Sequence, residues 1–216
     1  GGGNAPDIMK CVSEPNIMAS STNPTNPFSI NTYDEEIDML ITCHNLNRNV
    51  PTDMAFIYGR ARAETQRAED VMHDIGALSA VGADSQGVGR AAESAQRAFQ
   101  MAAANKARFG KLPEDAEGND NFRVKRYLAK VTINPAIGMG VSGYVGSISA
   151  GKLADLVFWR PGFFIAKPEV IIKGGFISHS NMGDPAGSIM TPQPQKYRPQ
   201  YGAFGDNVRK TCYTFV

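Results

Sequence analysis

The sequence lacks the features that mark a membrane-spanning protein or a strongly basic binder of nucleic acid. None of its hydrophobic runs approaches the ~18 residues that a transmembrane helix needs. Its 22 lysine and arginine residues nearly balance 21 aspartate and glutamate residues, so the formal net charge is only +1. This balance argues against a nucleic-acid-binding surface and against an acidic disordered tail. With 42% hydrophobic and 20% charged residues, the composition is typical of a globular protein.

Cysteine and histidine are also scarce, which limits the metal chemistry that these 216 residues can perform alone. The three cysteines are an odd number and lie too far apart for a zinc ribbon: Cys11, Cys43 and Cys212. The three histidines are too few and too scattered for a cage of three or four ligands: His44, His73 and His179. A complete metalloenzyme is therefore not expected, and the cysteine usage indicates a reducing compartment.

The first residues contain neither an initiator methionine nor a signal peptide. The chain opens with Gly1, Gly2, Gly3 and Asn4. Consecutive glycines either let the backbone approach a ligand closely or form a flexible start. We expect the chain to begin inside a longer protein.

Hydrophobic periodicity and turn residues predict a mixed α/β fold. Helices are expected over four stretches, with a helical or mixed segment at 52–59: about 33–44, 64–74, 90–108 and 122–130. The longest of them has an apolar stripe and is closed by Gly110: Ala91, Ala95, Phe99, Ala102 and Ala103. Strands are expected at 16–19, where the segment would be buried, and at 77–83. The remainder is β-rich, with short runs at 145–148, 154–159 and 170–177.

Asp84 is the sharpest single candidate for chemistry. It follows an apolar run of strand length and precedes a glycine-rich turn that leads to the long helix. In an α/β barrel this position is the carboxyl end of a strand, where catalytic residues collect. A carboxylate there binds a metal ion or accepts a proton from water. The alternative is an N-cap of the next helix, which contributes about 1 kcal/mol of stability.

Cys43 and His44 are the only adjoining thiol and imidazole in the chain. Protonated imidazole can act as a general acid, and a thiol can act as a nucleophile. Adjacent residues do not face each other on a helix, so a Cys–His ion pair is less favoured than a pair on a surface or lid. Arg60 also has two interpretations. It is either a candidate for chemistry or part of a solvated helix face, which its charged neighbours indicate. For His73 and Asp74 a structural hydrogen bond at a helix end is favoured.

Several motifs, taken together and in order, resemble one family: the catalytic alpha subunit of urease, in the amidohydrolase superfamily. They cover nearly the whole chain: 1–8, 20–25, 38–44, 68–71, 84–86, 118–127, 132–136, 145–157 and 191–194. The resemblance implies hydrolysis of urea to ammonia and carbamate at a two-nickel centre in the full-length protein. The other nickel ligands of the family, a His-x-His pair, a carbamylated lysine and two histidines, would precede Gly1. The isolated chain is therefore expected to be inactive.

The resemblance also implies a domain organisation. Residues 1–135 would form the late strands of a TIM (β/α)8 barrel, including a helical flap over about 33–66. Residues 136–216 would form part of a β-rich composite domain and a proline-rich tail. A partial barrel exposes strand edges and apolar faces, so poor solubility in isolation is expected.

The family's functional residues transfer to matching positions in this sequence. Asp84 matches an aspartate ligand of one nickel ion, and His44 matches the substrate-contacting histidine proposed as general acid. Cys43 matches the flap cysteine, and Arg60 the arginine that orients the substrate region. Two positions match residues whose backbone carbonyls line the urea pocket: Gly1 and Gly87. The implied partners are urea, the beta and gamma subunits (separate or fused) and accessory proteins for nickel loading, in the cytoplasm, with no nucleic acid and no membrane.

Three features depart from the family pattern, one of which is the turn after Asp84, where Gly87 and Val88 are smaller than the usual pair. Asn4 stands where a histidine near the site is usual, and Asn45 stands where relatives often carry a second histidine. Loss of a residue that supports a metal ligand weakens a site by roughly 10–100-fold. Two alternatives therefore stay open: a urease-like amidohydrolase with an altered metal or substrate, and a non-catalytic structural homologue.

Overall fold

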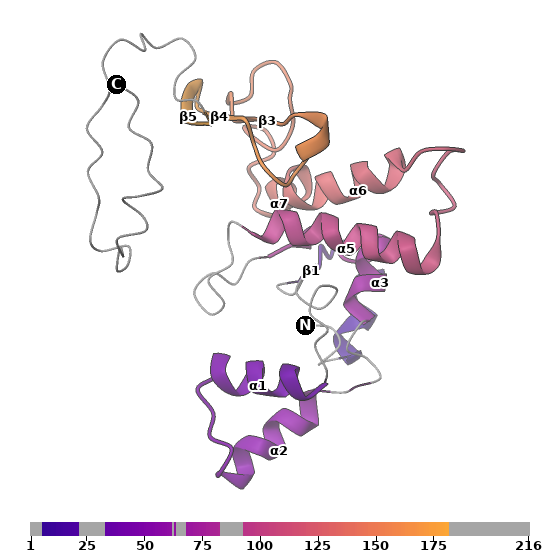
Figure 1. Ribbon diagram of the computed structural model, residues 1–216, viewed down its shortest axis with the longest axis vertical. Helices are drawn as coiled ribbons and strands as arrows, with labels where there is room; N and C mark the ends of the chain where they lie inside the picture. The colour runs from indigo at the N-terminus through magenta and orange to yellow at the C-terminus, as the bar shows by residue number, and fades with distance from the viewer. Residues whose placement is uncertain (1–5, 22–32, 62, 64–67, 83–92, 182–216) are drawn as a thin grey trace, which may run out of the picture.

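The computed structural model describes residues 6–21, 33–61, 63, 68–82 and 93–181. Figure 1 shows a pair of helices at one end, a group of helices in the middle and a small sheet near the other end. The elements are, in chain order, η1 (Pro6–Ser13), β1 (Ser20–Ser21), α1 (Tyr33–Cys43), α2 (Pro51–Arg60), α3 (Ala68–Asp74), β2 (Ala80–Val81), α5 (Ser94–Phe109), α6 (Asn121–Val131), α7 (Ile133–Gly138), β3 (Leu156–Phe158), η4 (Pro161–Phe163), β4 (Val170–Lys173) and β5 (Phe176–Ser180). The predicted mixture of helix and strand is thus observed.

β1 and β2 pair in parallel, although some sixty residues separate them in the sequence. Ser20 lies opposite Ala80 and Ser21 opposite Val81. The expected buried strand at 16–19 is wrong: the strand begins at Ser20, and Ile17 and Met18 are exposed. The reason is local, because the Ile17 N–H donates to Glu14 O and keeps this stretch in a turn. β2 is also shorter than the strand predicted at 77–83.

The central core lies between α5 and α6. Ala98, Met101 and Ala102 of α5 pack with Tyr127 of α6, and all four side chains are buried. The predicted helix 90–108 corresponds to α5, which ends at Gly110 with φ +80°, while residues 83–92 lie outside the described part. The predicted stripe was partly wrong, because Ala103 is exposed. The buried face instead repeats at helical spacing over Ala98, Met101, Ala102 and Asn105.

The region after α7 contains a three-stranded antiparallel sheet in the order β3–β4–β5. The predicted run at 170–177 is a hairpin rather than one strand, because Gly174 and Gly175 have φ of +59° and +88° and turn the chain. The predicted β run at 145–148 is wrong, since the chain forms turns and bends there. Gly146 (φ +92°) packs so closely on α7 that a Cβ would lie 2.8 Å from Ala136 Cβ. With this φ, Gly146 does not have the extended backbone of a strand.

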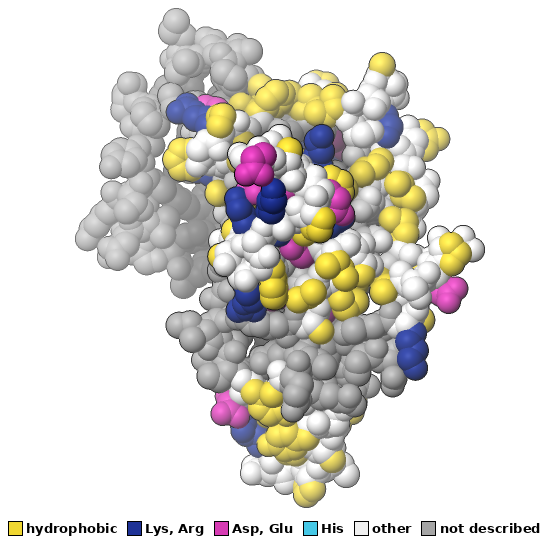
Figure 2. Space-filling view, turned by 90° about the vertical axis from the view of Figure 1, so that its right-hand side faces the viewer, with side chains coloured by type: hydrophobic (Ala, Val, Ile, Leu, Met, Phe, Trp, Pro, Cys, Tyr) yellow, Lys and Arg dark blue, Asp and Glu magenta, His cyan; other side chains and the backbone are white. Residues whose placement is uncertain are grey.

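Large apolar side chains stay on the surface at both ends of the molecule. Figure 2 shows hydrophobic side chains over the upper part and over the helical pair below. The most exposed are Met139, Ile148 and Phe176, at 79%, 90% and 81%. Within the described residues, no helix is both long enough and apolar enough to cross a bilayer.

Candidate functional site

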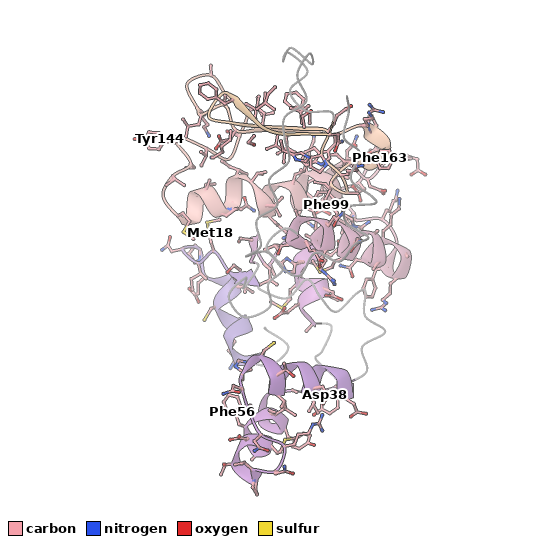
Figure 3. The ribbon with its side chains drawn as sticks, turned by 60° about the vertical axis from the view of Figure 1, so that its left-hand side comes forward. Met18, Asp38, Phe56, Phe99, Tyr144 and Phe163 are labelled. Carbon is pink, nitrogen blue, oxygen red and sulfur yellow. The ribbon has the colours of Figure 1, made fainter. Side chains whose placement is uncertain are left out.

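Cys43 and His44 lie at the end of a helical hairpin made of α1 and α2, which has its own small core. Ile37 of α1 packs against Ile57 of α2 and Ala61, all three buried. The Tyr33 hydroxyl donates to Ala61 O at 3.0 Å, which ties the start of α1 to the end of α2. Figure 3 shows the hairpin with Asp38 on α1 and Phe56 on α2. The helix predicted at about 33–44 is therefore confirmed, and the segment at 52–59, predicted as helical or mixed, is a helix.

His44 is the C-cap of α1, and hydrogen bonds define the turn around it. The Leu46 N–H donates to Ile41 O at 2.9 Å, and the Asn45 N–H donates to Thr42 O at 3.3 Å. Asn45 adopts φ +53°, which completes a Schellman motif. Asparagine is one of the few non-glycine residues that tolerate this conformation.

The side chain of His44 is exposed and contacts an aromatic ring of the second helix. The ring centroids of His44 and Phe56 lie 6.4 Å apart, with an interplanar angle of 73°. Cys43 is an exposed free thiol in the last position of α1. Both side chains are thus exposed, and the preference for a lid or surface pair over a thiol nucleophile stays a prediction.

The other predicted site residues are placed only in part. Arg60 is the last residue of α2, where its backbone lies next to the buried Ala61. Gly1, Asp84 and Gly87 lie outside the described residues, as do Asn4, Cys212 and the proline-rich tail. The structure therefore does not show Asp84 beside His44 or Arg60.

A buried ion pair joins α3 to α6 and was not predicted from the sequence. Arg123 donates from Nε and Nη2 to the two carboxylate oxygens of Asp74, each at 3.0 Å. This is the bidentate geometry in which arginine binds a carboxylate most strongly. The Tyr127 hydroxyl also donates to Asp74 Oδ1 at 3.2 Å, and burial raises the pKa of Tyr127. The expectation that Asp74 makes a structural contact at a helix end is confirmed.

The same arginine is held by the loop that precedes α6. The backbone N–H groups of Arg123 and Leu112 donate to the Asp115 carboxylate at 3.1 and 3.2 Å. Desolvation opposes ionisation of Asp115, yet these hydrogen bonds and the guanidinium charge keep its pKa below the ordinary value. Arg123 Nη2 donates further to Gly110 O at 2.8 Å. The end of α5, the loop and the start of α6 thus share one polar network.

Two side chains beyond the ion pair fix the entrance to β2. Lys130 Nζ donates to Leu78 O, and Asn134 Nδ2 donates to Ser79 O at 2.8 Å. Burial and, to a smaller extent, the charge of Arg126 lower the pKa of Lys130 to about 8, while the charge of Asp74 acts in the opposite direction. The sequence did contain a signal for this face, because 123, 127 and 130 recur at helical spacing. Because two of these three residues are charged, the pattern does not resemble a buried hydrophobic face.

His73 is fully buried at the end of α3. Burial lowers its pKa to about 3, and the positive charge of Lys130 acts in the same direction. Neither ring nitrogen has a hydrogen-bond partner among the described residues. These residues also contain no group of three or more His, Cys, Asp or Glu side chains suited to a metal ion. His73 is therefore a neutral interior group, and the structural hydrogen bond expected of its side chain is wrong within the described part of the chain, because both buried ring nitrogens lack a partner there.

Comparison with known proteins places the chain in a family. The model of the amidohydrolase family matches residues 1–189. The chain is similar to urease subunit alpha of Yersinia enterocolitica, Yersinia pestis and Yersinia pseudotuberculosis, with 56% identity over all 216 residues in each case. It spans 38% of the length of each of these relatives. Because the family model covers most of the sequence, the chain belongs to the amidohydrolase family, whose fold is of the TIM-barrel type.

Proposed function

We propose that this chain is part of a urease alpha subunit and that the full-length protein hydrolyses urea to ammonia and carbamate. The observation that carries the proposal is the 56% identity to urease alpha subunits along the entire chain. Residues 1–135 would belong to the late part of a TIM barrel with a flap at about 33–66, and residues 136–216 to a β-rich composite domain. The α1–α2 hairpin supports this proposal, because it is a compact unit that could cover a site and exclude water.

The proposed roles of the residues follow the family match. His44 would donate a proton to the leaving ammonia, with Cys43 beside it on the flap, and Arg60 would orient the substrate region. Exposure of His44 supports this role, since a general acid must reach its substrate within hydrogen-bond distance. Two backbone carbonyls would line the urea pocket: those of Gly1 and Gly87.

The proposal of a nickel centre rests only on the family match. Two nickel ions, when bound, would supply Lewis-acid activation of urea and of water. Asp84 is the residue of this chain that would hold one of them, and it lies outside the described part. The beta and gamma subunits and the accessory proteins that load nickel would be the partners. A cytoplasmic location would keep free thiols such as Cys11 and Cys43 reduced.

Ammonia release tests the proposed function. The full-length, nickel-loaded assembly should release ammonia from urea, and a His44→Gln variant should lower kcat by about 10²–10⁴-fold, as loss of a general acid does. The isolated 216-residue chain should release none above a no-protein control. Ammonia release by the isolated chain would refute the view that most ligands lie elsewhere.

Metal analysis separates the proposal from its two alternatives. A urease should contain two nickel ions per alpha subunit, whereas a non-catalytic homologue should assemble with partners and contain none. In an Asn4→His variant, an increase in nickel content would show that Asn4 weakens the site. Unchanged nickel content would argue against that defect. A different metal in the active protein would favour the amidohydrolase with altered chemistry.

A further inference from the structure

We propose that Phe56 is a positioning residue that holds the imidazole of His44 in its working orientation. The proposal rests on the proposed role of His44 as general acid. It starts from the contact of the two rings, one at the end of α1 and the other on α2.

The backbone of His44 is fixed independently of Phe56. Its N–H donates to Leu40 O at 3.0 Å, and the Schellman motif closes the turn immediately after it. Leu46, which ends this motif, packs on the core of the hairpin. The orientation of the imidazole therefore depends on which side-chain rotamer His44 adopts among those that its backbone allows.

The ring of Phe56 supplies the missing restraint. At 6.4 Å and 73° the pair has the edge-to-face arrangement that aromatic quadrupoles favour. Phe56 is 41% exposed, whereas Ile57 on the same helix is buried. Phe56 therefore lies outside the buried core of the hairpin and in contact with His44.

The helix that carries Phe56 is itself well anchored. Ile57 and Ala61 are buried against α1, and the Asp53 carboxylate accepts the Asn47 N–H at 2.9 Å in the connecting loop. A second hydrogen bond, from Asn49 N to Asn47 Oδ1, also measures 2.9 Å. Phe56 thus projects from a support whose position relative to α1 is set by other residues.

A general acid works only when its proton points toward the leaving group. Loss of the ring would let the imidazole of His44 populate other rotamers and would reduce the fraction of enzyme ready to donate. Urea binding by other groups would be unaffected. The change should therefore appear in kcat and leave KM nearly unaltered.

The test uses the nickel-loaded holoenzyme with three substitutions. Phe56→Leu keeps an apolar side chain without the ring, and Phe56→Tyr restores the ring. Tyr58→Leu is the matched control, because Tyr58 is an exposed aromatic residue of the same helix. Two quantities are measured for each: the kinetic constants, and the rate at which diethyl pyrocarbonate modifies His44, followed by mass spectrometry of its peptide.

Phe56→Leu should lower kcat by about 3- to 10-fold, the size expected for one aromatic contact. It should also raise the rate of His44 modification, because the imidazole loses the ring that lies beside it. Phe56→Tyr should restore both quantities, and Tyr58→Leu should change neither.

Three results would overturn the proposal: unchanged kcat and unchanged modification in Phe56→Leu, a fall in kcat without a change in modification, or an equal effect of Tyr58→Leu. The modification rate also separates this proposal from the proposed function. If His44→Gln keeps full activity while Phe56→Leu alters His44 modification, His44 is not the general acid. The inference that Phe56 orients the imidazole of His44 would still hold.

Discussion

Single residues between α3 and α6 show how a polar interior is stabilised. Asp74, Arg123 and Asp115 are almost fully buried. The Arg123 guanidinium donates to Asp74 and lies 3.9 Å from an Asp115 carboxylate oxygen, and the Arg123 backbone N–H donates to Asp115. Removing one member of such a group leaves the others unpaired in a medium of low dielectric constant. The cost of a substitution therefore depends on burial far more than on the number of ion pairs.

Asp74→Asn should strongly destabilise the protein. Arg123 would stay buried without its bidentate partner, so the free energy of unfolding should fall by about 3–5 kcal/mol. Guanidinium denaturation measures this change. Glu117→Gln is the control, because the Lys111–Glu117 pair is exposed and such pairs contribute about 0–1 kcal/mol. Similar losses in the two variants would contradict this interpretation of the network.

His73 predicts a dependence of stability on acid pH. Its folded pKa of about 3 lies below the ordinary value of 6.5, so the unfolded chain binds an extra proton between these limits. The contribution of His73 is fully present above pH 6.5 and is lost as the pH falls toward 3, by about 1.4 kcal/mol per pH unit. Denaturation curves at several pH values should show a shallower slope for His73→Leu. Equal slopes for both proteins would rule out this role.

At the scale of the element, packing against a neighbouring element determines whether a segment with strand-like composition forms a strand. The segment at 145–148 has the composition of a strand, but Gly146 lies against Ile133 and Ala136. The close contact, together with φ +92°, holds the segment as a turn on α7. The hairpin of β4 and β5 likewise depends on two glycines with positive φ.

Gly146→Ala should therefore destabilise the fold. Its Cβ would lie 2.8 Å from Ala136 Cβ and 3.1 Å from Ile133 Cα, and its φ would be strained. The expected loss is roughly 2–3 kcal/mol, from overpacking and left-handed strain together. Thermal unfolding of Gly143→Ala provides the matched comparison, since nothing lies within 4 Å of a Cβ there and its φ is not positive. If both alanines are tolerated, the close packing of this turn is wrong.

At the scale of the whole molecule, the described part leaves much apolar surface uncovered. Ile148 and Phe176 are 90% and 81% exposed in the region of α7 and the sheet. The chain spans 38% of its relatives' length. Apolar surface of this kind promotes association when nothing covers it.

The isolated chain should self-associate, and two added charges should reduce this. A double variant, Ile148→Lys with Phe176→Lys, should raise the monomer fraction in size-exclusion chromatography with light scattering. Ser149→Lys with Ser178→Lys adds the same charge next to these positions without removing apolar side chains. If the serine variant is equally effective, net charge rather than apolar surface drives association.

The sequence by itself determined the family and most of the helices. Helical periodicity located α1, α5 and α6, because one face of each packs on a neighbour and must repeat every three to four residues. It also singled out Cys43 and His44, which the structure places on an exposed helix end, whereas the roles proposed for Asp84, Gly1 and Gly87 depend on the family match alone.

Only the tertiary structure decided the rest. It brought Asp74 to Arg123 and His44 to Phe56, and it turned 145–148 away from a strand. These outcomes depend on contacts between residues that are distant in sequence or lie on different elements. The spacing of hydrophobic residues along an element indicates which of its faces is buried. It does not indicate which other element packs on that face.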